Sequence, residues 1–177
     1  DYVYAGDLQG NIWKFDFTSP KVVDWGLHVE GDPFFVATDS AGKRQPITGG
    51  LSVSLNPTDF KPWVFFGTGK YIESIDLTSA DVQTLYGVKD LGAAVGARAT
   101  NLQARTLVAT GIIDNQPVRA FEANAPLDQA KKGWYVDLPA PTTTPPTPAE
   151  RMVGDPFLLG TTLEAASIVP RSNPCGG

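Results

Sequence analysis

The sequence predicts an all-β fold, namely part of a β-propeller with about three blades of four antiparallel strands each. Glycine and proline contribute 18 and 15 of the 177 residues, an excess that favours many short elements joined by turns. Apolar and polar residues alternate along most of the chain with the period of two that is typical of β-strands. About a dozen such runs fit roughly three blades, fewer than a closed ring needs. A β-sandwich is the alternative, although no Greek-key spacing favours it.

Residues 3–16 predict the first β-hairpin. Gly10 and Asn11 lie between two β-prone runs and are suited to the positive φ angles of a tight turn. In the second run, Lys14 and Asp16 alternate with apolar residues. We therefore expect both charged side chains to face solvent while their apolar neighbours face the core.

Further strands are predicted wherever an alternating or apolar run is bounded by turn residues. These runs lie at 34–39, 44–48, 51–55, 63–69, 84–89, 106–111, 133–138, 151–160 and 163–170. Helix is predicted only as single turns, at 79–83 and 123–130. The segment 93–105 is open to two interpretations, short helical pieces or a long loop.

The chain is expected to be a single fragment of one domain, residues 1–177. A weak internal repeat supports this, because 3–16 and 64–90 both place an aromatic residue and a glycine at the end of a buried strand, followed by a turn and another strand. Residues 139–149 form a Pro/Thr-rich segment that predicts an exposed connector. Too little chain follows it to fold alone, so it interrupts strands and does not separate domains.

Charge and composition exclude several classes of function. The net charge is -5 without any basic block, so no nucleic acid partner is expected. No apolar run approaches the roughly 18–20 residues of a membrane span. The chain opens on Asp1 without a signal sequence, as an excised or processed fragment would. Cys175 is the only cysteine and His28 the only histidine, which excludes an internal disulfide and a cysteine-based zinc site. A structural or surface role is expected for His28.

Four stretches, in this order, carry a resemblance to a known family. They are YVYAGDLQGNIWKFD at 2–16, WVFFGTGKY at 63–71, GWYVDL at 133–138 and IVPRSNPCGG at 168–177. The first is similar to a blade of the quinoprotein-like propellers. Together they resemble the C-terminal propeller of the PilY family, the pilus-tip adhesins of type IV pilus biogenesis, along essentially the whole chain.

The resemblance implies a non-enzymatic structural and adhesion module that acts in pilus extension, twitching motility and surface attachment. Minor pilins and host or abiotic surfaces are the implied partners. The implied location is the cell surface, at the pilus tip or outer membrane, reached through the periplasm. In this family a calcium-binding loop immediately precedes the Tyr-Ala-Gly-Asp motif, and Asp1 matches only its last position. Calcium is therefore expected to regulate the full-length protein, while this chain, with one of the six to eight oxygens required, should bind it poorly.

The candidate chemical motifs favour structural roles. The run Gly67–Lys70 resembles a phosphate loop, but the first glycine of that motif is replaced by Val64 and the final hydroxyl residue by Tyr71. Carboxylates that close or follow strands are expected to accept backbone hydrogen bonds in turns, and not to act as acids or bases. They are Asp7, Asp16, Asp76, Asp90 and Asp137.

Three tryptophans, Trp13, Trp63 and Trp134, lie in predicted strands and are expected to pack between blades, whereas the position of Trp25 is less defined. Ile12 and Trp13 are adjacent, and both are expected to be buried because both faces of an inner propeller strand meet neighbouring blades.

Two further functions remain open besides the pilus module. One is a glycan- or peptide-binding propeller of another surface protein, and the other is a fragment of a quinone-dependent dehydrogenase.

Overall fold

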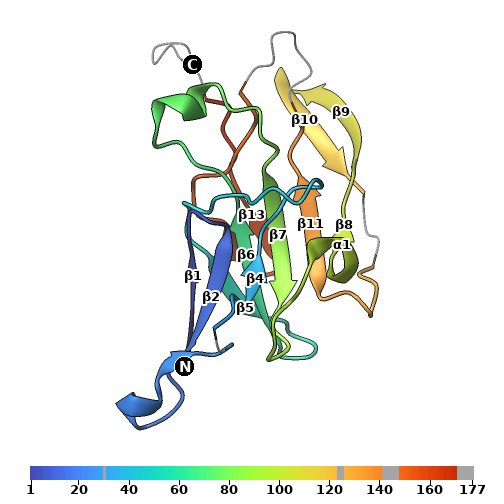
Figure 1. Cartoon of the computed structure of the whole chain (residues 1–177). Coiled ribbons are helices and arrows are strands. Elements are labelled where there is room, and N and C mark those ends of the chain that lie inside the picture. Colours follow the sequence, from blue (N-terminus) through green and yellow to red (C-terminus); the bar gives the residue numbers. More distant parts are fainter. Residues whose placement is uncertain (30, 123–125, 141–147, 171–177) are drawn as a thin grey trace.

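The computed structural model describes residues 1–29, 31–122, 126–140 and 148–170, and within them the fold is almost entirely β (Figure 1). Two larger sheets face each other and two separate hairpins accompany them. The all-β class predicted from the sequence is confirmed. The strands are distributed as sheets of four, five, two and two, and not as uniform blades of four.

The first sheet contains the predicted N-terminal hairpin. Strands β1 (Tyr2–Gly6) and β2 (Asn11–Asp16) pair antiparallel, and β2 also pairs with β3 (Gly26–Leu27) and β4 (Phe35–Val36). The turn differs from the prediction, because only Gly10 adopts a positive φ, of 78°. Asn11 is already part of β2.

The second sheet has the order β5 (Ser52–Leu55), β6 (Pro62–Gly67), β7 (Thr84–Lys89), β11 (Gly133–Asp137), β8 (Gln103–Ala104). All neighbours are antiparallel except β8, which runs parallel to β11. The hairpins are β9 (Leu107–Ile113) with β10 (Gln116–Phe121), and β12 (Phe157–Leu159) with β13 (Thr162–Glu164).

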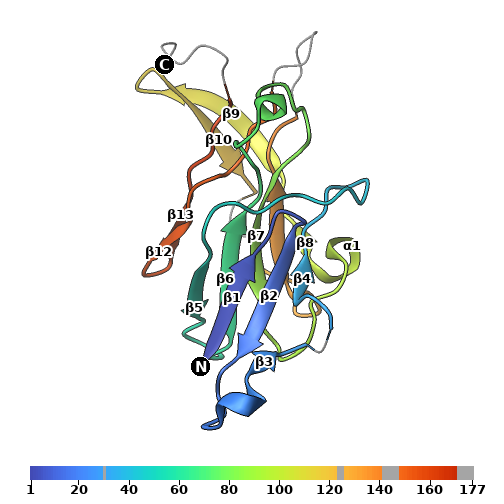
Figure 2. The same cartoon turned by 60° about the vertical axis from the view of Figure 1, so that its left-hand side comes forward.

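The core lies between the two larger sheets, the first of which covers one face of the second (Figures 1 and 2). Apolar side chains from both sheets meet there and lose their contact with water, which is the main stabilising contribution to the fold. The fully or nearly fully buried members are Ile12, Phe34, Phe35, Ala37, Ile47, Val64, Phe66, Tyr86, Val88, Val95 and Leu102.

The burial of β2 corrects the predicted orientation of Lys14. Ile12 and Lys14 lie on the same face of the strand and both are buried, whereas Trp13 on the opposite face is half-buried. The prediction for Lys14 was wrong because a charged residue in an alternating strand was assigned to the solvent face. A carboxylate on the neighbouring sheet makes the buried position favourable for this lysine.

Helix is limited to short turns: η1 (Val22–Asp24), η2 (Ser74–Leu77) and α1 (Arg98–Asn101). The last falls in the segment 93–105 that the sequence left open. The turn predicted at 79–83 does not form, and 126–130 is not helical, while 123–125 lies outside the described residues. No helix in the described ranges has the length and apolar character needed to cross a membrane.

Several predicted strands are shorter than expected. Residues 44–48 contribute only isolated bridges, and 151–160 contains only β12 and a bridge from Arg151 to Ile168. Proline and glycine at 154–156 explain the second case, because they interrupt a continuous ladder. Strand β10 was not predicted.

Of the predicted connector 139–149, positions 141–147 lie outside the described residues, as does Cys175. Pro139 and Ala140 are exposed, and Ala149 is buried.

Candidate functional site

Asp1, the predicted metal ligand, is an exposed residue just before β1. Its carbonyl oxygen accepts a hydrogen bond from the backbone N–H of Phe17, 2.8 Å away. Within the described ranges, no group of three or more His, Cys, Asp or Glu side chains is arranged to hold a metal ion. Calcium requires six to eight oxygen ligands, and the role of Asp1 in such a site stays a prediction.

Asp7 organises the first hairpin turn, as the sequence predicted for this class of carboxylate. Its oxygens accept hydrogen bonds from the backbone N–H of Gln9 and Asn11, from the Asn11 side chain and from Trp13 Nε1, at 2.8–2.9 Å. Partial burial opposes ionisation, but the bonds from Asn11 and Trp13 hold the pKa of Asp7 below its usual value. The turn and the half-buried tryptophan are therefore fixed by one carboxylate.

Asp90 joins the two larger sheets through a buried ion pair. Lys14 Nζ lies 2.6 Å from Asp90 Oδ2, and both side chains are only 3% exposed. The hydroxyl of Tyr4 donates a hydrogen bond to the same oxygen, and Gly92 N–H donates to the other. Burial acts against the charged carboxylate, but Lys14 and Tyr4 lower its pKa overall. The tyrosine pKa is raised, by burial and then by Asp90.

Arg98 and Asp137 form a second, partly buried network, at the start of β7 and the end of β11; the Arg98 side chain is 5% exposed and that of Asp137 35%. The guanidinium makes two parallel hydrogen bonds to the carboxylate, both 2.8 Å long, and Nη1 also lies 3.1 Å from the Tyr86 hydroxyl. Thr84 Oγ1 donates to Asp137, and Gln45 connects Thr84 with Tyr86. Burial raises the pKa of Tyr86 to about 12, against the opposing effect of Arg98. These groups are mutually satisfied, which favours a structural role.

Arg151 is a buried cation that sequence analysis missed. Its guanidinium donates hydrogen bonds to the carbonyl oxygens of Lys70, Ser79 and Ala149, at 2.9–3.1 Å. It therefore ties both ends of the loop at 70–79 to the segment before β12. Within that loop, Asp76 accepts bonds from Ile72 and other groups, so this predicted carboxylate also has a structural role. Arg151 begins the predicted strand 151–160, and nothing in its local sequence indicated this role.

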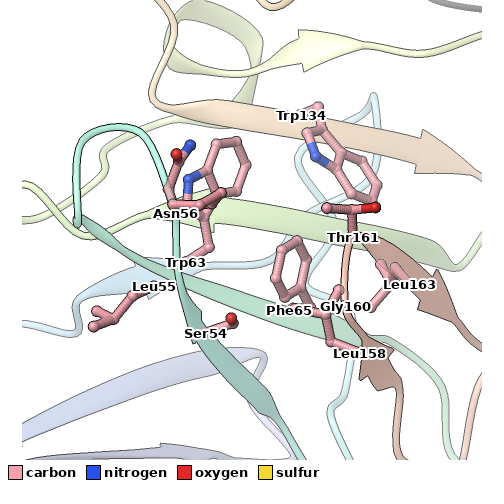
Figure 3. A pocket seen from close by; sticks show the side chains of 11 residues that line it. Ser54, Leu55, Asn56, Trp63, Phe65, Trp134, Leu158, Gly160, Thr161 and Leu163 are labelled. Atoms are coloured by element: carbon pink, nitrogen blue, oxygen red, sulfur yellow. The ribbon is translucent and has the colours of Figure 1, made fainter.

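An aromatic groove lies on the face of the second sheet that points away from the core. It has a volume of about 320 Å³. Figure 3 shows its floor, formed by Trp63 and Phe65 of β6 and Trp134 of β11, with Leu158 and Leu163 of the hairpin β12–β13 at one side. Polar groups come from Ser54, Asn56 and Thr161, and none of the lining side chains is charged.

Strand register explains how the aromatic floor forms. Phe65 and Trp134 both stand opposite Gly87, on either side of β7. A Cβ atom at Gly87 would lie 2.6 Å from the indole of Trp134, so the glycine leaves room for that ring over β7. Trp63 stacks on Phe65 with ring centroids 5.9 Å apart. The indole nitrogen of Trp63 is buried without a hydrogen-bond partner among the described residues.

A second cavity, of about 480 Å³, shares Trp134 and Leu163 with the groove but is also lined by charged side chains. Arg119 of β10 makes two hydrogen bonds to Glu150, 2.7 and 2.8 Å long, and Ser167 donates to the same carboxylate.

The expectation that tryptophans pack between blades is met only in part. Trp63 and Trp134 line the groove together with Leu158 and Leu163 of β12–β13, whereas Trp13 is half-buried and bonded to Asp7.

Residues 1–124 match the family model of the PilY1 beta-propeller domain. The chain belongs to this family. The resemblance carried by the four motifs is therefore confirmed. The matched region includes the first sheet and most of the second, whereas Trp134 and the hairpin β12–β13 lie beyond it.

Relatives and a solved structure agree with the family assignment. A type IV pilus biogenesis factor PilY1 homolog from Xylella fastidiosa is 35% identical over 175 residues, covering 96% of this chain and 12% of the relative. Type IV pilus biogenesis factor PilY1 from Pseudomonas aeruginosa is 33% identical, covering 99% and 18%. The crystal structure of the Pseudomonas aeruginosa PilY1 C-terminal domain matches with a TM-score of 0.80 and 31% identity, over 96% of this chain and 41% of that one. The chain thus spans less than a fifth of these relatives and about two fifths of the solved domain.

Proposed function

We propose that this chain is a non-enzymatic structural and adhesion module of a type IV pilus biogenesis factor, acting in pilus extension, twitching motility and surface attachment. The observation that carries the proposal is the match over 96% of the chain to the PilY1 C-terminal domain, in both fold and sequence. Minor pilins and host or abiotic surfaces are its proposed partners, and the cell surface or pilus tip its proposed location.

The architecture suits a scaffold. Two ion pairs, the buried Lys14–Asp90 and the partly buried Arg98–Asp137, join secondary-structure elements. Catalytic groups usually require a cleft in which an acid or base can reach a substrate. Here the acid and the base of each pair bind each other, which supports a role in presenting surfaces.

The test is genetic and uses the whole protein in the bacterium that encodes it. A strain lacking the codons for residues 1–177 should assemble fewer surface pili and spread less by twitching, and the intact gene should restore both. Attachment should be compared in a background that cannot retract pili, so that assembly and adhesion are measured separately. Unchanged pilus number, twitching and attachment would contradict the proposal.

Calcium regulation is a separate part of the proposal. We infer that Asp1 contributes one carboxylate to a calcium loop completed by residues that precede it in longer family members. In the full-length protein, Asp1→Asn should weaken calcium binding by about tenfold or more, because the site loses a charged oxygen ligand. Asp32→Asn, at another exposed position, is the matched control. Equal affinities for the two variants and the unmodified protein would exclude Asp1 from the site.

One observation favours a second candidate, a glycan-binding surface protein. The aromatic groove combines tryptophan and phenylalanine rings with hydroxyl and amide groups and lacks charge, a composition suited to neutral sugars. A glycan array probed with the protein, and with Trp134→Ala beside it, tests this function. Binding that depends on Trp134 would support it, and an array without signal would exclude it for the glycans printed. Nothing in the described residues favours the third alternative, a quinone-dependent dehydrogenase.

A further inference from the structure

The ribbon formed by β9 and β10 has an exposed edge whose properties differ from those of the other strands. It projects from the two larger sheets in both views (Figures 1 and 2). Every residue of β9 is exposed, and β9 is the longest strand in the described part of the chain. Among those residues its only ladder partner is β10.

The register of the ribbon shows which backbone groups lie at this edge. Asp114 and Asn115 form a two-residue turn with φ angles of 49° and 61°, so Ile113 and Gln116 face each other as a hydrogen-bonded pair. Alternation then directs the N–H and C=O groups of Thr110 and Ile112 outward. A register shift near Val108 is confined to the base of the ribbon.

The two edges of the ribbon are protected to different degrees. Natural edge strands commonly carry charge, proline or bulges that prevent pairing with other chains. At the outer edge of β10, opposite Ile112 and Thr110, stand Pro117, which has no N–H, and the charged Arg119. Strand β9 contains no charged residue and no proline along its seven residues. The edge of β9 therefore lacks the features that hinder pairing with another strand at the edge of β10.

We propose that the outer edge of β9 receives an extended, uncharged β-strand from another protein, which adds a third strand to the ribbon. Main-chain hydrogen bonds to Thr110 and Ile112 would supply affinity, as in other cases of β-strand addition. Val108 and Ile112 are 60% and 75% exposed and offer apolar contacts to side chains of the added strand. The neutrality of β9 favours a neutral partner strand, because a charged one would lose hydration without gaining an opposite charge. The proposal does not depend on the pilus role.

The anchoring of the ribbon supports a docking role. Arg119 and Glu150 join β10 to the body of the molecule through two hydrogen bonds, and Glu122 N–H donates to Thr106 O at the base. The edge is thus held in a defined place before any strand arrives. Preorganisation of this kind reduces the entropy lost on binding.

The test uses a synthetic, uncharged peptide of alternating valine and threonine with blocked ends, added to the 177-residue protein. Amide hydrogen exchange is followed by NMR. At saturating peptide, the amides of Thr110 and Ile112 should exchange at least about tenfold more slowly, whereas those of Ala109 and Gly111, already bonded to β10, should change little. A peptide with a central proline is the matched control ligand.

Two variants make the test specific. Thr110→Pro removes an outward N–H and keeps the bonds within the ribbon, and it should abolish the protection. Ile112→Lys places a charge on the edge and should weaken binding by about tenfold or more, whereas Val23→Lys, in the exposed helical turn η1, should not. The proposal is wrong if the peptide protects no amide, if it protects another edge such as β5, or if sedimentation shows that β9 instead pairs two copies of the chain.

Discussion

At the scale of single residues, the buried charges decide how the chain is held together. Lys14 was assigned to solvent because its neighbours alternate with it, yet its ammonium group is buried beside Asp90. No local pattern could reveal this, since the two residues are 76 positions apart in the sequence and meet only when the sheets pack. Asp7, by contrast, bonds within its own turn, and its structural role could be predicted from the sequence.

Lys14→Met should destabilise the protein strongly. The variant keeps the volume of the side chain but leaves Asp90 buried without its cation, which typically costs about 3–5 kcal/mol. Lys43→Met is the control, because the Lys43–Asp81 pair is 60% and 46% exposed and such pairs contribute less than about 1 kcal/mol. Urea denaturation measures both. Similar losses for the two variants would show that burial of Lys14 has little energetic weight.

Asp90 also predicts sensitivity to acid. Its pKa is lower in the folded protein than in the unfolded chain despite its burial, because Lys14 and Tyr4 stabilise the carboxylate. The unfolded state therefore binds more protons in this range, and the free energy of unfolding rises with pH. The contribution is complete above the unfolded pKa of about 3.9 and is lost as pH falls through the folded value. Urea midpoints should drop below about pH 4, and Asp90→Asn should flatten that part of the profile.

At the scale of elements, local patterns predicted strands well and pairings poorly. The strands at 51–55, 63–69, 84–89, 106–111 and 133–138 form close to their predicted bounds. Strand β10 was missed because Pro117 and Arg119 break the apolar pattern. The groove could not be predicted, since it depends on β7 pairing with β11 across more than forty residues. The tryptophans were expected to pack between blades, and nothing in the sequence indicated that Trp63 and Trp134 lie on either side of Phe65 on one face of the sheet.

Gly87→Ala should disturb the groove. The added methyl group would lie 2.6 Å from the Trp134 indole, so the ring or the strand must move, at a cost of roughly 1–3 kcal/mol. Gly111→Ala is the control on exposed β9, where the nearest atom would be 3.8 Å away, and it should have little effect. Tryptophan fluorescence should shift only in Gly87→Ala. An unchanged fluorescence spectrum and an unchanged stability in Gly87→Ala would contradict this prediction, because the added methyl group would then fit beside the Trp134 indole without displacing it.

At the scale of the whole molecule, one core connects the two larger sheets. Ile12 and Phe35 of the first sheet belong to the same buried cluster as Phe66 and Tyr86 of the second, and Phe35 contacts both aromatic rings. No residue of the ribbon β9–β10 whose burial is described belongs to this cluster. The fold should therefore contain one cooperative unit and one element that opens independently.

Ile12→Ala distinguishes these two parts. Ile12 is fully buried, and truncating such a side chain costs about 2–5 kcal/mol. If the sheets unfold together, amides of β7 should lose as much protection against hydrogen exchange as those of β2, although the substitution is in β2 alone. Amides of β9 should exchange through local opening and keep their rates. Loss of protection confined to β2 would show that the sheets unfold separately, and an equal loss in β9 would show that the ribbon belongs to the cooperative unit.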